Sequence, residues 1–246
     1  MKTLLVDKYP YKEITRGSTN GKRFYNTPTG ALPSVTTILS ATKSEKDREG
    51  LENWRKWVGN ARADAICSEA ANRGTRMHKY LEDYVIDGVL KQPGSNPFAK
   101  EAHVMAEEIV NKGMCNVNEC WGTEISLYYP GIYAGSTDLV GEHKGNPAIL
   151  DFKQSNKPKT DERVQDYCIQ LAAYAEAHNA VYDTEINTGV ILMCVKPEQP
   201  KPGVFVNQKY QEWVIDGEAF KKWKNVWWKR VEDYYKIQAL EEQETN

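Results

Sequence analysis

The sequence predicts an α/β protein with a mixed central β-sheet that is flanked by helices and preceded by an N-terminal β-hairpin and a helical extension. Apolar residues recur at helical spacing in several long stretches, and short strand-like runs lie between them. Gly189 to Val195 is an almost continuous apolar run, typical of a buried strand. The order helix, three strands, helix, strand within one core favours a mixed sheet with helices on its faces. We expect one domain over residues 1–246.

Residues 1–42 are expected to form a β-hairpin and a loop. Asn20 and Gly21 separate two strand-like runs, and Asn-Gly is a strong hairpin signal. Ser34 precedes a short apolar stretch and is a candidate helix N-cap.

Residues 43–112 are expected to be mostly helical. Leu51, Trp54 and Val58 recur at spacings of three and four, which predicts an apolar helix face. We expect Gly74 to interrupt this helix, because glycine is a poor helix former.

Residues 113–215 are expected to form the central αβ core, and residues 216–246 a C-terminal helix. The core strands are expected at 124–129, 133–140, 148–152 and 189–195, with a turn over 141–147, a helix over 161–178 and an exposed pair of strands at 204–206 and 213–215.

Composition narrows the functional class without deciding it. The net charge is −2, so no overall basic field indicates a nucleic-acid partner, although a local basic cleft would not show in the total. The five cysteines are scattered, which favours reduced thiols over a disulfide framework. No signal-peptide-like or membrane-spanning apolar run is present. We therefore expect an intracellular, cytoplasmic protein without a membrane partner.

The sharpest chemical signal is a set of two acids and a lysine on neighbouring strands. Asp151 and Lys153 are two apart on a strand and so point to the same face. A hairpin places Asp138 opposite Asp151, and the backbone carbonyl of Phe152 offers another oxygen. Mg²⁺ and Mn²⁺ prefer such oxygen ligands. Taken alone, an Asp-x-Lys pair is more often a surface ion pair.

Two helical pairs accompany this set. Gly74 and His78, and likewise Gln170 and Tyr174, are four residues apart and share a helix face. Taken alone, His78 is more often a structural histidine, and Gln170 and Tyr174 are ordinary residues of an amphipathic helix.

In this order, the motifs resemble those of the RecB-like branch of the PD-(D/E)xK nucleases. That branch carries GxxxH, an upstream glutamate, GxxD, (D/E)xK and QxxxY. The matching segments here are Gly74–His78, Glu124, Gly135–Asp138, Asp151–Lys153 and Gln170–Tyr174. The stretch Leu32–Leu39 is also similar to phage members and to mitochondrial genome maintenance exonucleases.

The resemblance implies a restriction-endonuclease-like core and metal-dependent hydrolysis of DNA phosphodiester bonds. It implies that His78, Asp138, Asp151 and the Phe152 carbonyl bind Mg²⁺ or Mn²⁺, that Glu124 contacts the metal or its water, and that Lys153 positions the attacking water. Some relatives hold an iron–sulfur cluster through C-terminal cysteines. No cysteine follows Cys194 here, so no cluster is expected. The chain also lacks a P-loop, so the helicase part of RecB is not expected either.

DNA contacts require local positive or polar groups. The basic candidates are Arg73, Arg76 and Lys157, with a solvated charged face as the alternative. The resemblance implies that Gln170 and Tyr174 hold the DNA backbone or support the site, and that Ser155 is placed to meet a phosphate. Trp223, Trp227 and Trp228 could stack single-stranded bases, but their spacing favours core packing, with Trp228 off the stripe.

The leading hypothesis is an exonuclease that acts on ends of single-stranded DNA, of phage or phage-like origin and so in the host cytoplasm. Replication or recombination proteins are further candidate partners. An endonuclease of the flap, junction or restriction type and a catalytically inactive DNA-binding protein remain as alternatives.

Overall fold

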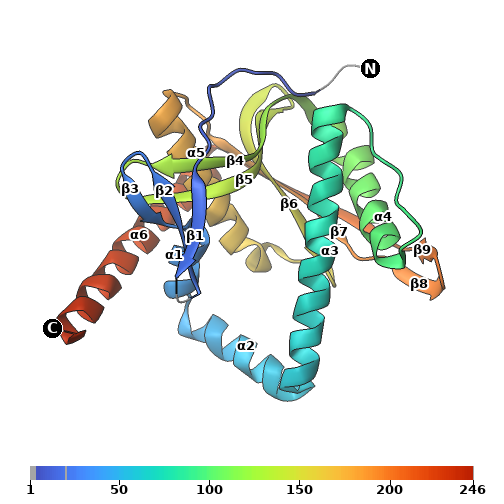
Figure 1. Ribbon diagram of the computed structural model, residues 1–246, viewed down its shortest axis with the longest axis horizontal. Helices are drawn as coiled ribbons and strands as arrows, with labels where there is room; N and C mark the ends of the chain where they lie inside the picture. The colour runs from blue at the N-terminus through green and yellow to red at the C-terminus, as the bar shows by residue number, and fades with distance from the viewer. Residues whose placement is uncertain (1–3, 20, 246) are drawn as a thin grey trace.

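A five-stranded mixed sheet occupies the centre of the computed structural model, which describes residues 4–19 and 21–245 (Figure 1). The strand order is β10-β7-β6-β5-β4. β4 (Val117–Tyr129), β5 (Tyr133–His143) and β6 (Asn146–Ser155) form an antiparallel meander. β6 pairs in parallel with β7 (Thr188–Val195), which pairs antiparallel with β10 (Lys209–Ile215). The predicted mixed sheet is therefore confirmed.

Helices cover both faces of this sheet (Figure 1). They are α1 (Val35–Ala41), α2 (Glu45–Val58), α3 (Asn60–Asp87), α4 (Pro97–Lys112), α5 (Gln165–Tyr182) and α6 (Gly217–Thr245), with short 3-10 turns at Met114–Asn116 and Asp161–Arg163. Successive strand residues point to opposite faces, and the two cores follow this alternation. Ile149 and Ile191 pack with α1, α5 and α6, whereas Leu150 and Leu192 pack with α3 and α4.

The N-terminal part forms a separate three-stranded antiparallel sheet rather than a simple hairpin. Its strands are β1 (Thr15–Thr19), β2 (Lys22–Thr27) and β3 (Gly30–Pro33). Ser34 caps α1 as expected, because its hydroxyl accepts a 3.0 Å hydrogen bond from the Thr37 N–H. Of the predicted Asn20–Gly21 turn, Asn20 lies outside the described residues, and Gly21 has a φ of +73° that suits a turn.

The predicted break at Gly74 is wrong, because α3 runs through it without interruption. One glycine costs a helix only about 1 kcal/mol, which the buried face of α3 offsets. The chain breaks instead at Gly59, whose φ of +86° ends α2 and precedes α3. The predicted helix with Leu51, Trp54 and Val58 is present as α2, but its apolar side chains lie outside the core: none of the residues of α2, all of them described, is buried, and Leu51 is 50% exposed.

Strands are present at both expected positions, 204–206 and 213–215, but they do not pair with each other. β9 (Val204–Val206) pairs with β8 (Glu198–Lys201), and β10 joins the central sheet. The core strands are longer than expected, and only Lys144 and Gly145 turn the chain between β5 and β6.

No helix within residues 4–19 and 21–245 combines the length and apolar character needed to cross a bilayer.

Candidate active site

The β5–β6 hairpin brings two acids and a lysine to one patch. The register pairs Leu139 with Leu150, so Asp138 and Asp151 are the next residues on the two strands. Lys153 follows Asp151 on the same face, and its ammonium forms an ion pair with the Asp151 carboxylate. Asp138 is 9% exposed and Asp151 3%, so these charges face each other in a largely dry environment.

His78 reaches this patch from α3, which crosses the sheet beside β6 (Figure 1). Its Nδ1 lies 3.3 Å from Asp138 Oδ1 and 3.8 Å from Glu124 Oε1. The imidazole also meets the Phe152 ring edge to face, with centroids 6.1 Å apart. Gly74, one turn earlier, faces the Gln154 side chain of β6, and a Cβ there would make an ordinary 3.5 Å contact with it.

Glu124 points its carboxylate into the site through an unusual backbone conformation. Its φ is +51°, in the left-handed region that glycine favours. The neighbouring ladder pairs are Thr123 with Leu139 and Ile125 with Thr137, and they bracket Glu124. The Thr123 hydroxyl donates a 2.9 Å hydrogen bond to the Asp138 carbonyl. A strained non-glycine residue inside a strand is typical of functional sites.

His78, Glu124 and Asp138 could hold a metal ion together. One ligand atom from each lies within 4.8 Å of the others. The two carboxylates suit Mg²⁺ or Mn²⁺, and the imidazole of His78 offers a nitrogen ligand beside them. The Phe152 N–H donates a 2.6 Å hydrogen bond to Asp138 Oδ2, which leaves Oδ1 for a ligand. The N–H and C=O of a strand residue point to the same side, so the Phe152 carbonyl also faces β5. Asp151 lies outside this compact trio, with its carboxylate on Lys153.

Burial and mutual charge shift the pKa values of His78, Asp138 and Asp151. Burial opposes the imidazolium of His78, but Asp138 and Glu124 outweigh it and raise the pKa of His78 to about 10. Burial raises the pKa of Asp151 to about 6, against the pull of the Lys153 ammonium. Burial also opposes the Asp138 carboxylate, but His78 and Lys153 hold its pKa below the ordinary value. Such clustered shifts are typical of functional sites.

Helix α5 closes the patch from the other side. The Gln170 amide donates a 2.8 Å hydrogen bond to the Tyr174 hydroxyl, and Tyr174 is 2% exposed. Gly135 is needed here, because a Cβ would come 2.7 Å from the Tyr174 ring. Gln170 and Tyr174 therefore pack behind the site as structural residues.

Tyr167 belongs to the patch but was not predicted from the sequence. Its ring centre lies 5.0 Å from Lys153 Nζ, a distance at which a cation and a ring attract each other. It precedes Gln170 by three residues, so helical spacing from the QxxxY segment was the signal that could have revealed it.

The predicted DNA-contacting residues fall into different environments. Lys157 and Arg76 are exposed, and Arg76 lies 5.9 Å from the Phe98 ring. The Ser155 hydroxyl donates to the Lys157 carbonyl and is held by its own loop. Arg73 is buried. Trp227 is fully buried, and the Trp228 indole donates to Glu176, so both pack as structural residues.

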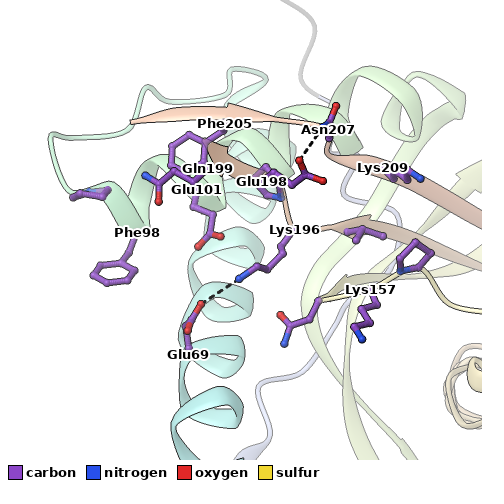
Figure 2. Close-up of a pocket in the computed structure, with 15 residues that line it drawn as sticks. Glu69, Phe98, Glu101, Lys157, Lys196, Glu198, Gln199, Phe205, Asn207 and Lys209 are labelled. Atoms are coloured by element: carbon purple, nitrogen blue, oxygen red, sulfur yellow. Dashed lines mark hydrogen bonds and ion pairs between the residues drawn. The ribbon is translucent and has the colours of Figure 1, made fainter. Parts of the chain in front are cut away.

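Two hollows adjoin the loop that follows β6. One of about 810 Å³ lies between that loop and α2 with the start of α3. Gln154 and Ser155, which directly follow Lys153, line this hollow. The other, of about 630 Å³, lies between α3, α4 and the β8–β9 hairpin (Figure 2). The two share Asn156, Lys157 and Pro158.

The fold and the site thus define an α/β protein with a candidate two-carboxylate, one-histidine metal centre beside a buried Asp–Lys pair. The chain is similar to the mitochondrial genome maintenance exonuclease 1 of three vertebrates. It is 26% identical to the Xenopus tropicalis protein over 211 residues (78% of this chain, 58% of that protein). It is 27% identical to the Mus musculus protein over 214 residues (83% and 59%) and 25% identical to the Homo sapiens protein over 212 residues (82% and 58%). The chain therefore spans less than two thirds of these relatives, and no protein-family model matches it.

Proposed function

We propose that this chain is a metal-dependent deoxyribonuclease of the RecB-like PD-(D/E)xK type that removes nucleotides from the ends of single-stranded DNA. The observation that carries the proposal is the convergence of His78, Glu124 and Asp138 beside the Asp151–Lys153 pair. The exonuclease names of the relatives agree with it. The same proposal includes that the central sheet and its helices form a restriction-endonuclease-like fold.

In the proposed site, His78, Glu124 and Asp138 hold Mg²⁺ or Mn²⁺, and Asp151 and the Phe152 carbonyl add oxygens on the β6 side. When bound, such a cation lowers the pKa of a coordinated water and offsets charge on the phosphate. Lys153 keeps its charge, because Asp151 and Asp138 outweigh burial and raise its pKa. Its ammonium, held between Asp151 and the Tyr167 ring, is placed to orient the attacking water and to stabilise the charge that develops on the phosphate.

The 810 Å³ hollow supports a single-stranded substrate. Trp54 and Trp57 line it from α2, and Trp57 is 84% exposed, so its indole is accessible to a ligand. Arg62, Lys157 and Arg163 line the same space. Aromatic rings stack on unpaired bases and basic groups bind the phosphates, so this wall suits a single strand despite the negative total charge.

The test is a digestion of end-labelled linear and of circular single-stranded DNA, with Mg²⁺ or Mn²⁺ and with a chelator. We expect cutting of the linear DNA only, and none with the chelator. The matched control is Asp138→Asn, which keeps the shape of the side chain but removes its charge and should be inactive. Cutting of the circle would favour an endonuclease. DNA binding without cutting in either metal would identify a catalytically inactive binding protein.

A further inference from the structure

Arg73 is a charged side chain buried between three elements of the fold. It is 3% exposed. Its Nε donates a 3.0 Å hydrogen bond to Gln154 Oε1, and Nη2 donates to Asn156 Oδ1. Its Nη1 donates to Glu69 Oε1 at 3.2 Å and lies 3.9 Å from Glu101 Oε2. The guanidinium is thus committed to partners within the protein, which leaves it poorly placed to contact DNA.

Two of these bonds join α3 to the end of the catalytic strand. Gln154 directly follows Lys153, and Asn156 begins the loop after β6. The Gln154 amide also donates a 3.0 Å hydrogen bond to the Ala70 carbonyl of α3, so both ends of this side chain are tied to the helix.

The acidic partners hold the guanidinium from its other side. Figure 2 shows Glu69 on α3 and Glu101 on α4 at the wall of the 630 Å³ hollow, with Lys196 joined to Glu69. Glu69 is half exposed, whereas the Glu101 side chain is only 14% exposed. Arg73 therefore bridges α3, α4 and β6 at one point.

A buried charge network is a poor source of stability, because desolvation offsets most of the attraction, and an apolar side chain would serve as well. A planar guanidinium with several donors instead holds its partners in one geometry. Here these partners fix the position of α3. Of the three residues His78, Glu124 and Asp138, His78 is the one that lies on a helix, and that helix is α3.

We propose that Arg73 is a positioning residue that locks α3 against the end of β6 and thereby keeps His78 within ligand distance of Asp138. This inference rests on the metal site of the proposed function. It assigns Arg73 to metal affinity and turnover and not to DNA affinity. Groups that hydrogen-bond a metal ligand directly change metal affinity or activity by about 10- to 100-fold, and Arg73 acts through the position of α3, so we expect an effect at the lower end of this range.

The test compares Arg73→Lys and Arg73→Gln with the parent chain. Lysine keeps the charge but loses the planar guanidinium with its several donors, and glutamine keeps an N–H donor but loses the charge. The matched control is Arg55→Gln, which removes the 2.6 Å ion pair from Arg55 on α2 to Asp64 on α3, away from the site. The measurements are Mn²⁺ affinity by electron paramagnetic resonance, kcat and KM on linear single-stranded DNA, and thermal unfolding with chelator.

Both Arg73 variants should bind Mn²⁺ about tenfold more weakly, with KM for DNA within about twofold and a turnover that added Mn²⁺ restores. The Arg55 variant should match the parent in Mn²⁺ affinity. Lower thermal stability with unchanged Mn²⁺ affinity would overturn the proposal and show that Arg73 only stabilises the fold. A raised KM with unchanged Mn²⁺ affinity would overturn it in favour of a DNA contact.

Asn156→Ala provides a second test if the Arg73 variants fail to fold, because it removes one bond from an exposed loop residue. It should weaken Mn²⁺ binding about threefold, by the same outer-shell effect, and unchanged affinity would overturn the proposal. A parent chain that binds Mn²⁺ but cuts no DNA would refute the proposed nuclease and leave the role of Arg73 decided by the Mn²⁺ titrations. A parent chain that binds no Mn²⁺ would overturn both.

Discussion

Substitutions at Glu124 separate the strain of its backbone from the chemistry of its carboxylate. The residue lies in β4 with a φ of +51°, where a side chain with a Cβ is disfavoured. We consider three variants: Glu124→Ala and Glu124→Gly, which both remove the carboxylate, and Glu124→Gln, which keeps its size. Both alanine and glycine lose the contact with His78, so that loss cancels when the two are compared.

The expected sign of the alanine–glycine difference is the reverse of the usual one. In an extended strand, glycine is less stable than alanine by roughly 0.5–1 kcal/mol. In the left-handed region alanine bears a strain of roughly 1–2 kcal/mol that glycine avoids. Glu124→Gly should therefore be more stable than Glu124→Ala by about 1 kcal/mol, which corresponds to a Tm difference of about 2–4 °C for a chain of this size.

The assay is thermal unfolding with a chelator, followed by Mn²⁺ titration and the nuclease assay. The control pair is Ser126→Ala and Ser126→Gly, two residues along the same strand, where glycine should be the less stable by about 0.5–1 kcal/mol. All three Glu124 variants should lose more than about tenfold in Mn²⁺ affinity, since a direct ligand matters at least as much as an outer-shell one. If Glu124→Ala is as stable as Glu124→Gly, the left-handed conformation and the reasoning built on it are refuted.

Three further predictions concern other residues. Lys153→Met should lower the nuclease rate at least about 100-fold while Mn²⁺ affinity stays within about threefold, because the ammonium acts on the reaction and not on the metal; a near-normal rate would contradict its assigned role. His178 is buried and neutral, and burial lowers its pKa to about 4, so the unfolded chain takes up the proton first as the pH falls. The free energy of unfolding of the parent chain should therefore fall by about 2 kcal/mol more than that of His178→Gln when the pH is lowered from 7.5 to 5. If denaturant titrations give the two chains equal pH profiles, this prediction is refuted. Gly74→Ala should raise the Tm by roughly 2–4 °C, because its Cβ meets only the Gln154 side chain at 3.5 Å and alanine favours a helix by about 1 kcal/mol; a lower Tm would show that α3 and β6 lie closer than described.

Local patterns predicted most of the elements correctly. The Ser34 cap, the buried strand at β7 and the helices α4 and α6 each depend on residues close together in the chain. The errors share a physical cause. The spacing of Leu51, Trp54 and Val58 predicts a helix but cannot say what its apolar face meets, and in α2 it faces the hollow and solvent. Likewise, the sequence of β9 does not indicate which strand edge is free to pair with it.

The sequence by itself determined which donors are available and which of them share a local face. Asp151 and Lys153 must point the same way on a strand, and Gln170 and Tyr174 on a helix, because the backbone repeat dictates it. Only the tertiary structure decided that α3 delivers His78 to Asp138, which lies sixty residues further along the chain. It also decided that Glu124 turns inward and that Arg73 is buried instead of exposed to a substrate. Those outcomes arise from the packing of whole helix and sheet faces, which no short stretch of sequence encodes.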